Sequence, residues 1–215
     1  MPAHVPPVTP ADAAIPPAGD APPSAERALA ETRAWIDRAV IGLNLCPFAK
    51  APQVKGLIRY VHTDATDTDA LVHVLIDELQ HLAATPITEV ETTVLVHPRV
   101  LQDFADYNDF LDVADASLAA LGLEGVLQVA SFHPDYQFAD APADDISHAT
   151  NRSPWPTLHL IREASIDRAV AAFPEAESIY ETNIATLQAL GAAGWAALQR
   201  QIRADADAPP DHRGP

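Results

Sequence analysis

Three apolar stretches of the chain each end in a histidine, the side chain best suited to acid–base chemistry and metal binding near neutral pH. They span residues 57–62, 92–97 and 126–133, and their last residues are His62, His97 and His133. Each stretch is short and rich in β-branched or aromatic residues, which predicts a largely buried strand. If these strands are parallel neighbours, the three imidazoles lie at the carboxyl edge of the sheet, where open α/β proteins bind their ligands.

A divalent metal ion is one ligand that such histidines could bind. His97 and His133, with His62 or His159 as a third ligand, could hold zinc or iron and leave one position open, as in catalytic metal sites. The ligands are dispersed along the chain and no HExxH pattern is present. The alternative is that the strand-end imidazoles hydrogen-bond to nearby backbone.

Cys46 is the only thiol of the chain, and it lies where the first predicted helix stops at Pro47. It could act as a nucleophile beside His133 or His159, because cysteine–histidine pairs are adjacent in space rather than in sequence. The alternative is a small buried residue that supports the turn. The predicted catalytic residues are Cys46, His97 and His133.

Basic residues are scarce, with 13 Lys and Arg against 30 Asp and Glu. Arg99 follows the second predicted strand, and Arg152 lies in a long irregular segment. A guanidinium group so placed is suited to binding a carboxylate or phosphate, although each could equally form a surface ion pair. The predicted substrate-binding residues are Lys50, Arg99, Tyr136, Asn151, Arg152 and His159.

Helical patterns separate the predicted strands. Apolar residues recur at helical spacing over about 25–45, 68–84 and 100–121, and again over 176–203 with a break near Gly191 or Gly194. Residues 133–156 have no clear period and are expected to cover a pocket. Residues 157–162 alternate polar and apolar, which predicts an edge or antiparallel strand. The predicted fold is a single α/β domain with a short, mostly parallel sheet of about four strands, covered by helices.

Composition sets the limits of this domain. Residues 1–24 are rich in Pro and Ala and 204–215 in Asp and Pro, so we expect disordered tails around a domain spanning 25–203. The formal charge of −17 argues against nucleic-acid binding. No apolar run reaches the length of a membrane-spanning helix, and a single cysteine permits no internal disulfide. We therefore expect a cytoplasmic protein without membrane contact.

Several short motifs of the chain resemble those of DUF1415, an uncharacterised protein family. The resemblance covers about residues 25–198 and implies a family but no activity. The motifs are Asn44-Leu-Cys-Pro-Phe-Ala-Lys50, Ser131-Phe-His-Pro-Asp-Tyr-Gln-Phe138, Thr150-Asn-Arg-Ser-Pro-Trp-Pro156 and Leu158-His-Leu-Ile-Arg-Glu163.

Three functions remain open on these residues. The first is a small enzyme that binds a small anionic metabolite at the carboxyl edge of the sheet and uses His, Cys and Arg chemistry. The second is a histidine-rich protein that binds zinc or iron. The third is a non-catalytic protein-interaction module, which predicts scattered histidines, no enclosed pocket and an exposed apolar patch.

Overall fold

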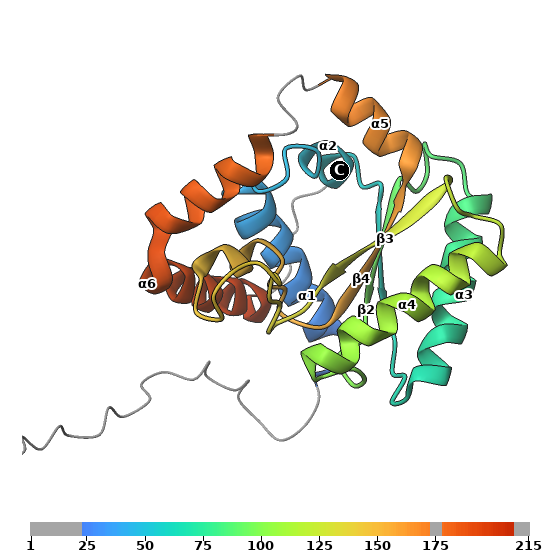
Figure 1. Cartoon of the computed structure of the whole chain (residues 1–215), viewed down its shortest axis with the longest axis horizontal. Helices are drawn as coiled ribbons and strands as arrows, with labels where there is room; N and C mark the ends of the chain where they lie inside the picture. Colours follow the sequence, from blue (N-terminus) through green and yellow to red (C-terminus); the bar gives the residue numbers. More distant parts are fainter. Residues whose placement is uncertain (1–22, 173–177, 209–215) are drawn as a thin grey trace, which may run out of the picture.

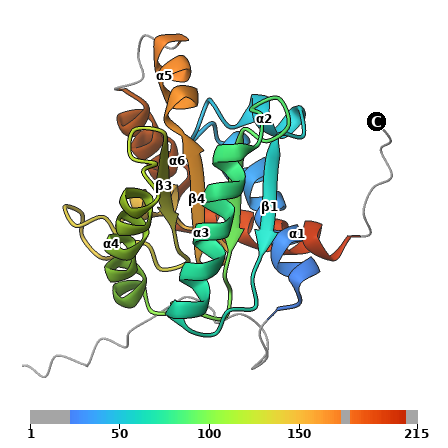
Figure 2. The same cartoon turned by 90° about the vertical axis from the view of Figure 1, so that its right-hand side faces the viewer.

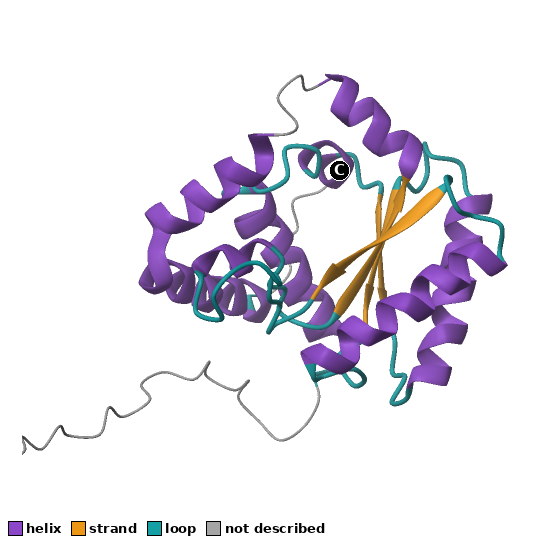
Figure 3. Cartoon of the chain, in the orientation of Figure 1, coloured by secondary structure: helices purple, strands orange, loops and turns teal. Residues whose placement is uncertain are grey.

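The computed structural model describes residues 23–172 and 178–208, which form a four-stranded sheet with helices on both faces (Figure 1). In Figure 3 the strands lie between two groups of helices. The elements are α1 (Ala25–Trp35), the π-helix η1 (Ile36–Ile41), α2 (Lys50–Val54), β1 (Ile58–His62), α3 (Thr68–Ala84), β2 (Thr92–Val96), α4 (Phe104–Ala120), β3 (Leu127–Phe132), the 3-10 helix η2 (Ile146–Thr150), β4 (Thr157–Arg162), α5 (Glu163–Ala172) and α6 (Ile179–Asp207).

The strand order is β1-β2-β4-β3, so the last strand of the sequence lies inside the sheet. β1 and β2 pair in parallel, whereas β4 is antiparallel to both β2 and β3. The prediction of a mostly parallel sheet is therefore wrong, since only one of the three strand pairings is parallel. The antiparallel direction of β4 is confirmed, but its predicted place at an edge is not.

β1, β2 and β3 nevertheless point the same way, because β3 and β2 are both antiparallel to the strand between them. Their carboxyl ends, and with them His62, His97 and His133, lie at one edge of the sheet.

One face of the sheet is covered by α3 and α4 (Figure 2). The two helices begin where the sequence supplies a cap: the carboxylates of Asp67 and Asp103 accept hydrogen bonds from the first-turn amides. Leucines repeating along α3 meet Leu95, Leu158 and Leu160 of the central strands in an apolar core. The helical periodicity thus fixes which side of α3 and α4 is buried.

The other face is covered by α1, η1 and α6, which form a second core with Val94, Val96 and Phe132. α6 is kinked at Gly191, where φ is 66°. The predicted break of the last helix is therefore confirmed at Gly191, and the helix extends to Asp207, beyond the predicted domain end at Arg203.

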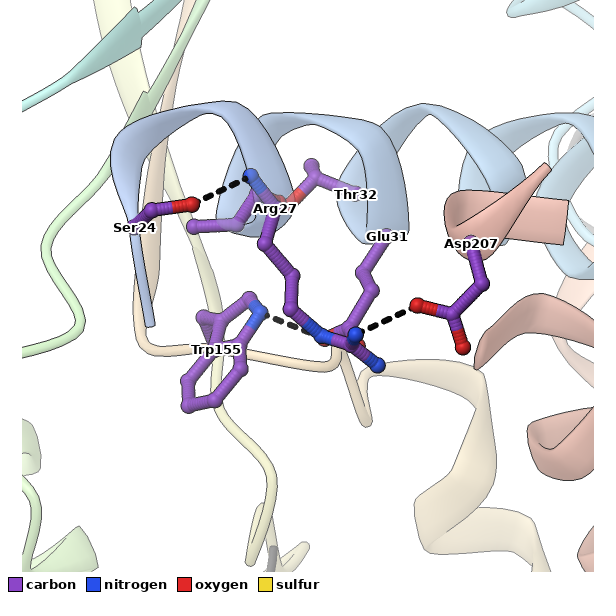
Figure 4. A network of polar contacts seen from close by, with 7 residues as sticks. Ser24, Arg27, Glu31, Thr32, Trp155 and Asp207 are labelled. Atoms are coloured by element: carbon purple, nitrogen blue, oxygen red, sulfur yellow. Dashed lines mark hydrogen bonds and ion pairs between the residues drawn. The ribbon is translucent and has the colours of Figure 1, made fainter. Parts of the chain in front are cut away.

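A buried carboxylate ties this layer to the segment before β4 (Figure 4). Glu31 of α1 is 3% exposed, and it accepts hydrogen bonds at 2.9 Å from both Arg27 Nε and Trp155 Nε1. Arg27 also pairs with Asp207 at the end of α6. The network joins three segments that are far apart in the sequence, and it orders the end of the irregular segment 133–156.

The predicted tails lie mostly outside the described residues: 1–22 and 209–215 are not described. None of the helices in the described ranges combines the length and the apolar composition that a bilayer-spanning segment requires.

Candidate functional site

A cavity of about 740 Å³ lies between the sheet, the end of α1 with η1, the segment 46–55 and α5. It is on the sheet face opposite α3 and α4. Its strand residues include Leu57, Ile58 and Thr92 at the amino ends of β1 and β2. The cavity therefore extends to the amino ends of β1 and β2, the end of the sheet where α2 and α5 lie in Figure 1.

Most of the cavity wall is apolar. The side chains that give it this character come from α1, η1, the segment after η1 and the sheet, and they include Trp35, Ile36, Phe48, Val94, Phe132 and Ile161. Trp35 meets Phe132 edge-to-face with ring centroids 5.2 Å apart. A volume of this size with an apolar wall is typical of small-molecule sites, which hold a few polar groups among hydrophobic ones.

His159 is the imidazole in this wall. It lies in the middle of β4, level with Val94 of β2 on one side and Ala130 of β3 on the other. Its Nε2 is 2.7 Å from Thr92 Oγ1. Burial lowers the pKa of His159 to about 4, so the ring is neutral at physiological pH.

Cys46 also lines the cavity. Burial raises the pKa of its thiol, and hydrogen bonds from the backbone of Phe48 and Ala49 oppose this only in part. No imidazole is among the groups that shift this pKa. The thiol is therefore protonated at neutral pH, which is the opposite of an activated nucleophile.

Charged groups sit where the cavity meets solvent. Lys55 and Arg168 both line it and are exposed. Arg168 pairs with Glu91 at 3.2 Å, and Lys55 has no ion-pair partner among the described residues. The opening thus offers one paired and one unpaired cation to an anionic group.

The predicted catalytic residues His97 and His133 lie elsewhere, beneath α4, and both are fully buried. Nδ1 of His97 is 3.1 Å from the carbonyl of Val100. In His133, Nε2 is 3.2 Å from the carbonyl of Leu101, and Nδ1 accepts a hydrogen bond from the Asp135 amide. The two rings lie on Tyr107, with centroid distances of 5.8 and 5.0 Å.

These contacts favour the structural alternative for His97 and His133. The pKa of His133 is lowered mainly by burial, while Asp135 and Asp103 oppose the shift. Neither Arg99 nor Arg152 is among the groups that shift this pKa.

The other predicted substrate-binding residues do not line the cavity. Arg99 forms an exposed ion pair with Asp64 at 3.2 Å. Arg152 donates to the carbonyl of Tyr136, and Asn151 donates to the carbonyl of Ser131, so both hold backbone in place. Lys50 is exposed at the start of α2.

In the part of the chain that the structure describes, no three His, Cys, Asp or Glu side chains come together as a metal site. The candidate ligands His62, His97 and His133 therefore do not form a common ligand set. Of the residues predicted from sequence, the cavity brings together Cys46 and His159.

Thr92 and Arg168 were not predicted as site residues. One signal could have pointed to the cavity: Ala130 is a small side chain in a strand whose other inward positions are larger, which indicates space over the sheet. The partner of His159 could not be found in this way, because Thr92 is 67 residues away in sequence.

Comparison with known proteins adds a family to this geometry. The family model described as a protein of unknown function, DUF1415, matches residues 27–197. The chain belongs to this family. The DUF1415 match includes every residue that lines the cavity, from Trp35 to Ala169. No curated protein and no solved structure matches the chain.

Proposed function

We propose that this DUF1415 protein binds a small, largely apolar molecule in the cavity, with an anionic group of that molecule at the opening. The observation that carries the proposal is the cavity itself, of about 740 Å³, with a mainly apolar wall and two cations at its opening. Burying an apolar molecule there removes apolar surface from water on both sides of the contact.

The proposal keeps the anionic ligand expected from the sequence and moves it from the carboxyl edge of the sheet to the cavity. Lys55 is a suitable contact for an anion because it has no ion-pair partner among the described residues. An anion near Arg168 would compete with Glu91, which is 3.2 Å away.

Binding alone is proposed, without a catalytic step. The raised pKa of Cys46 argues against a thiolate nucleophile, and the backbone contacts of His133 argue against an acid–base role. A cavity of about 740 Å³ also favours a small-molecule ligand over a non-catalytic interaction module.

A matched pair of fluorescent probes tests the proposal. 1-Anilinonaphthalene-8-sulfonate and N-phenyl-1-naphthylamine share one apolar body, and only the first carries an anionic group. Both should bind and fluoresce, and the sulfonate should bind more tightly. Lys55→Glu should reduce this preference, because it replaces the free cation by a like charge.

A filled cavity supplies the second arm. Ala130→Trp places a large ring in the cavity beside His159, and it should abolish probe binding. Ala116→Trp is the matched control, since Ala116 is exposed on α4 behind the other face of the sheet. Circular dichroism and thermal melts establish that both variants are folded. Equal binding by Ala130→Trp and Ala116→Trp would refute the proposed site.

A further inference from the structure

His159 has a fixed protonation pattern because of the threonine beside it. Thr92 Oγ1 is 2.6 Å from the carbonyl oxygen of Leu160, which can only accept a hydrogen bond. The single hydroxyl proton of Thr92 is therefore directed at this carbonyl. Thr92 Oγ1 must then accept from Nε2–H of His159, 2.7 Å away. The proton of the neutral ring is on Nε2, and Nδ1 carries a lone pair.

Nδ1 of His159 has no hydrogen-bond partner among the described residues. Nδ1 of His159 therefore keeps some solvent-accessible surface. Nε2 of His97, which also lacks a partner, has none. Because the His159 ring lines the cavity, we infer that the lone pair of Nδ1 points toward the cavity. An acceptor in an apolar wall gains most from a ligand that donates a hydrogen bond to it.

The same lone pair rejects an anion. A carboxylate or sulfonate has only acceptor atoms at neutral pH, so it cannot donate to Nδ1. The other side chains that line the cavity and can ionise are Cys46, Lys55, Glu91 and Arg168. The two cations among them are exposed at the opening, which separates the place for an anionic group from the place for a donor.

We propose that Nδ1 of His159 accepts a hydrogen bond from a hydroxyl group of the ligand, so that the cavity selects apolar hydroxyl compounds such as phenols and aryl alcohols. This inference rests on the proposed function and deepens it. Combined with the cations at the opening, it describes a ligand with an apolar body, a hydroxyl group inside the cavity and an anionic group outside. Thr92 is a positioning residue, because it acts on the ligand through the imidazole.

Two naphthalene derivatives that differ in one hydrogen-bond donor test whether the cavity prefers ligands with a hydroxyl group. 2-Naphthol can donate a hydrogen bond, and 2-methoxynaphthalene cannot. Isothermal titration at pH 7 should give 2-naphthol an affinity about tenfold higher, the effect of one hydrogen bond to a desolvated acceptor. His159→Phe should bring the ratio close to one. His73→Phe is the matched control, since His73 is exposed on α3 behind the opposite sheet face, and it should keep the ratio.

Substitutions at Thr92 distinguish a loss of ring positioning from a general loss of structure. Thr92→Val removes the acceptor for Nε2–H and lets the ring proton move to Nδ1, so the preference for 2-naphthol should fall. Thr92→Ser keeps the hydroxyl and should restore it. Long-range ¹H–¹⁵N NMR spectra of the free protein should show a protonated Nε2 and an unprotonated Nδ1 at pH 6.

Two results would overturn the inference. One is a protonated Nδ1 of His159 in these spectra, a measurement that requires no ligand. The other is the lack of any preference for 2-naphthol in the native protein, including the absence of binding. The proposed function is judged separately by the anilinonaphthalene probes and Ala130→Trp. Normal probe binding without a hydroxyl preference refutes only the role of His159.

Discussion

Acid should destabilise this protein through buried imidazoles, and His97 offers the clearest case. Its side chain is fully buried, and burial lowers its pKa from 6.5 to about 4. The unfolded chain therefore binds a proton at a higher pH than the folded chain does. Stability is complete above pH 6.5 and falls as the pH drops toward 4, where the folded state begins to take up the proton as well.

The size of the effect follows from the two pKa values. A difference of one in pKa corresponds to about 1.36 kcal/mol, so His97 accounts for a total loss of ~3 kcal/mol below pH 4. About 2 kcal/mol of this should appear between pH 7 and pH 5. Asp145 and Asp205 add little in this interval, because hydrogen bonds lower their pKa from the ordinary 3.8 and both groups are ionised above pH 5 whether the chain is folded or unfolded. His159 contributes in the same way, because burial lowers its pKa from 6.5 to about 4, so the native protein should lose more stability than His97 alone explains.

His97→Phe isolates this contribution. The new ring keeps the contact with Tyr107, and the carbonyl of Val100 loses its donor, so the free energy of unfolding at pH 7 should fall by about 1–3 kcal/mol. The further loss on going to pH 5 should be ~2 kcal/mol smaller than in the native protein, measured by urea denaturation at both pH values. Leu75→Ala is the control, because it removes a buried side chain of α3 without removing an imidazole. If His97→Phe loses as much stability between pH 7 and pH 5 as the native protein, the reasoning is refuted.

Two further outcomes follow from other buried groups. Replacing Glu31 by Ala leaves Trp155 Nε1 without an acceptor and Arg27 without its buried partner, so urea denaturation should show a loss of about 2–4 kcal/mol. Trp155→Phe removes one hydrogen bond of the same network and should lose less, and the opposite order would contradict the network. Cys46 should react with iodoacetamide at least tenfold more slowly in the folded protein than in urea at pH 8, and its rate should still rise above pH 9, because burial raises the thiol pKa. A rate that levels off below pH 8 would contradict a protonated thiol.

The four strands and the longer helices could be predicted because their signals are local, whereas the short helices α2 and η2 were not. The cap at Asp67, the cap at Asp103 and the glycine at Gly191 each act within a few residues. Strand order is not local. The alternation in 157–162 predicted an edge or antiparallel strand. The strand is antiparallel but interior, and its polar face, with Thr157 and His159, lines the cavity.

The candidate site was predictable only in part for the same physical reason. His159 and Cys46 stand out by residue type, but their environment decides what they can do. The carbonyls of Val100 and Leu101 reach His97 and His133 through the turn before α4, and these contacts favour a structural role for both imidazoles. Thr92 reaches His159 only through the pairing of β2 with β4. Hydrogen-bond partners of this kind depend on strand register, which periodicity does not encode.

The interior position of β4 has a consequence for how the chain is made. β2 and β3 share no pairing with each other. β4, which is synthesised after both, joins β3 to the β1–β2 pair. On a ribosome, the edge of β2 and the whole of β3 remain unpaired until residue 162 has left the exit tunnel. Exposed strand edges of this kind favour association with other chains. Completion of the sheet is thus delayed until β4 has emerged, and any nascent chain that stops earlier carries an unpaired edge of β2 and an unpaired β3.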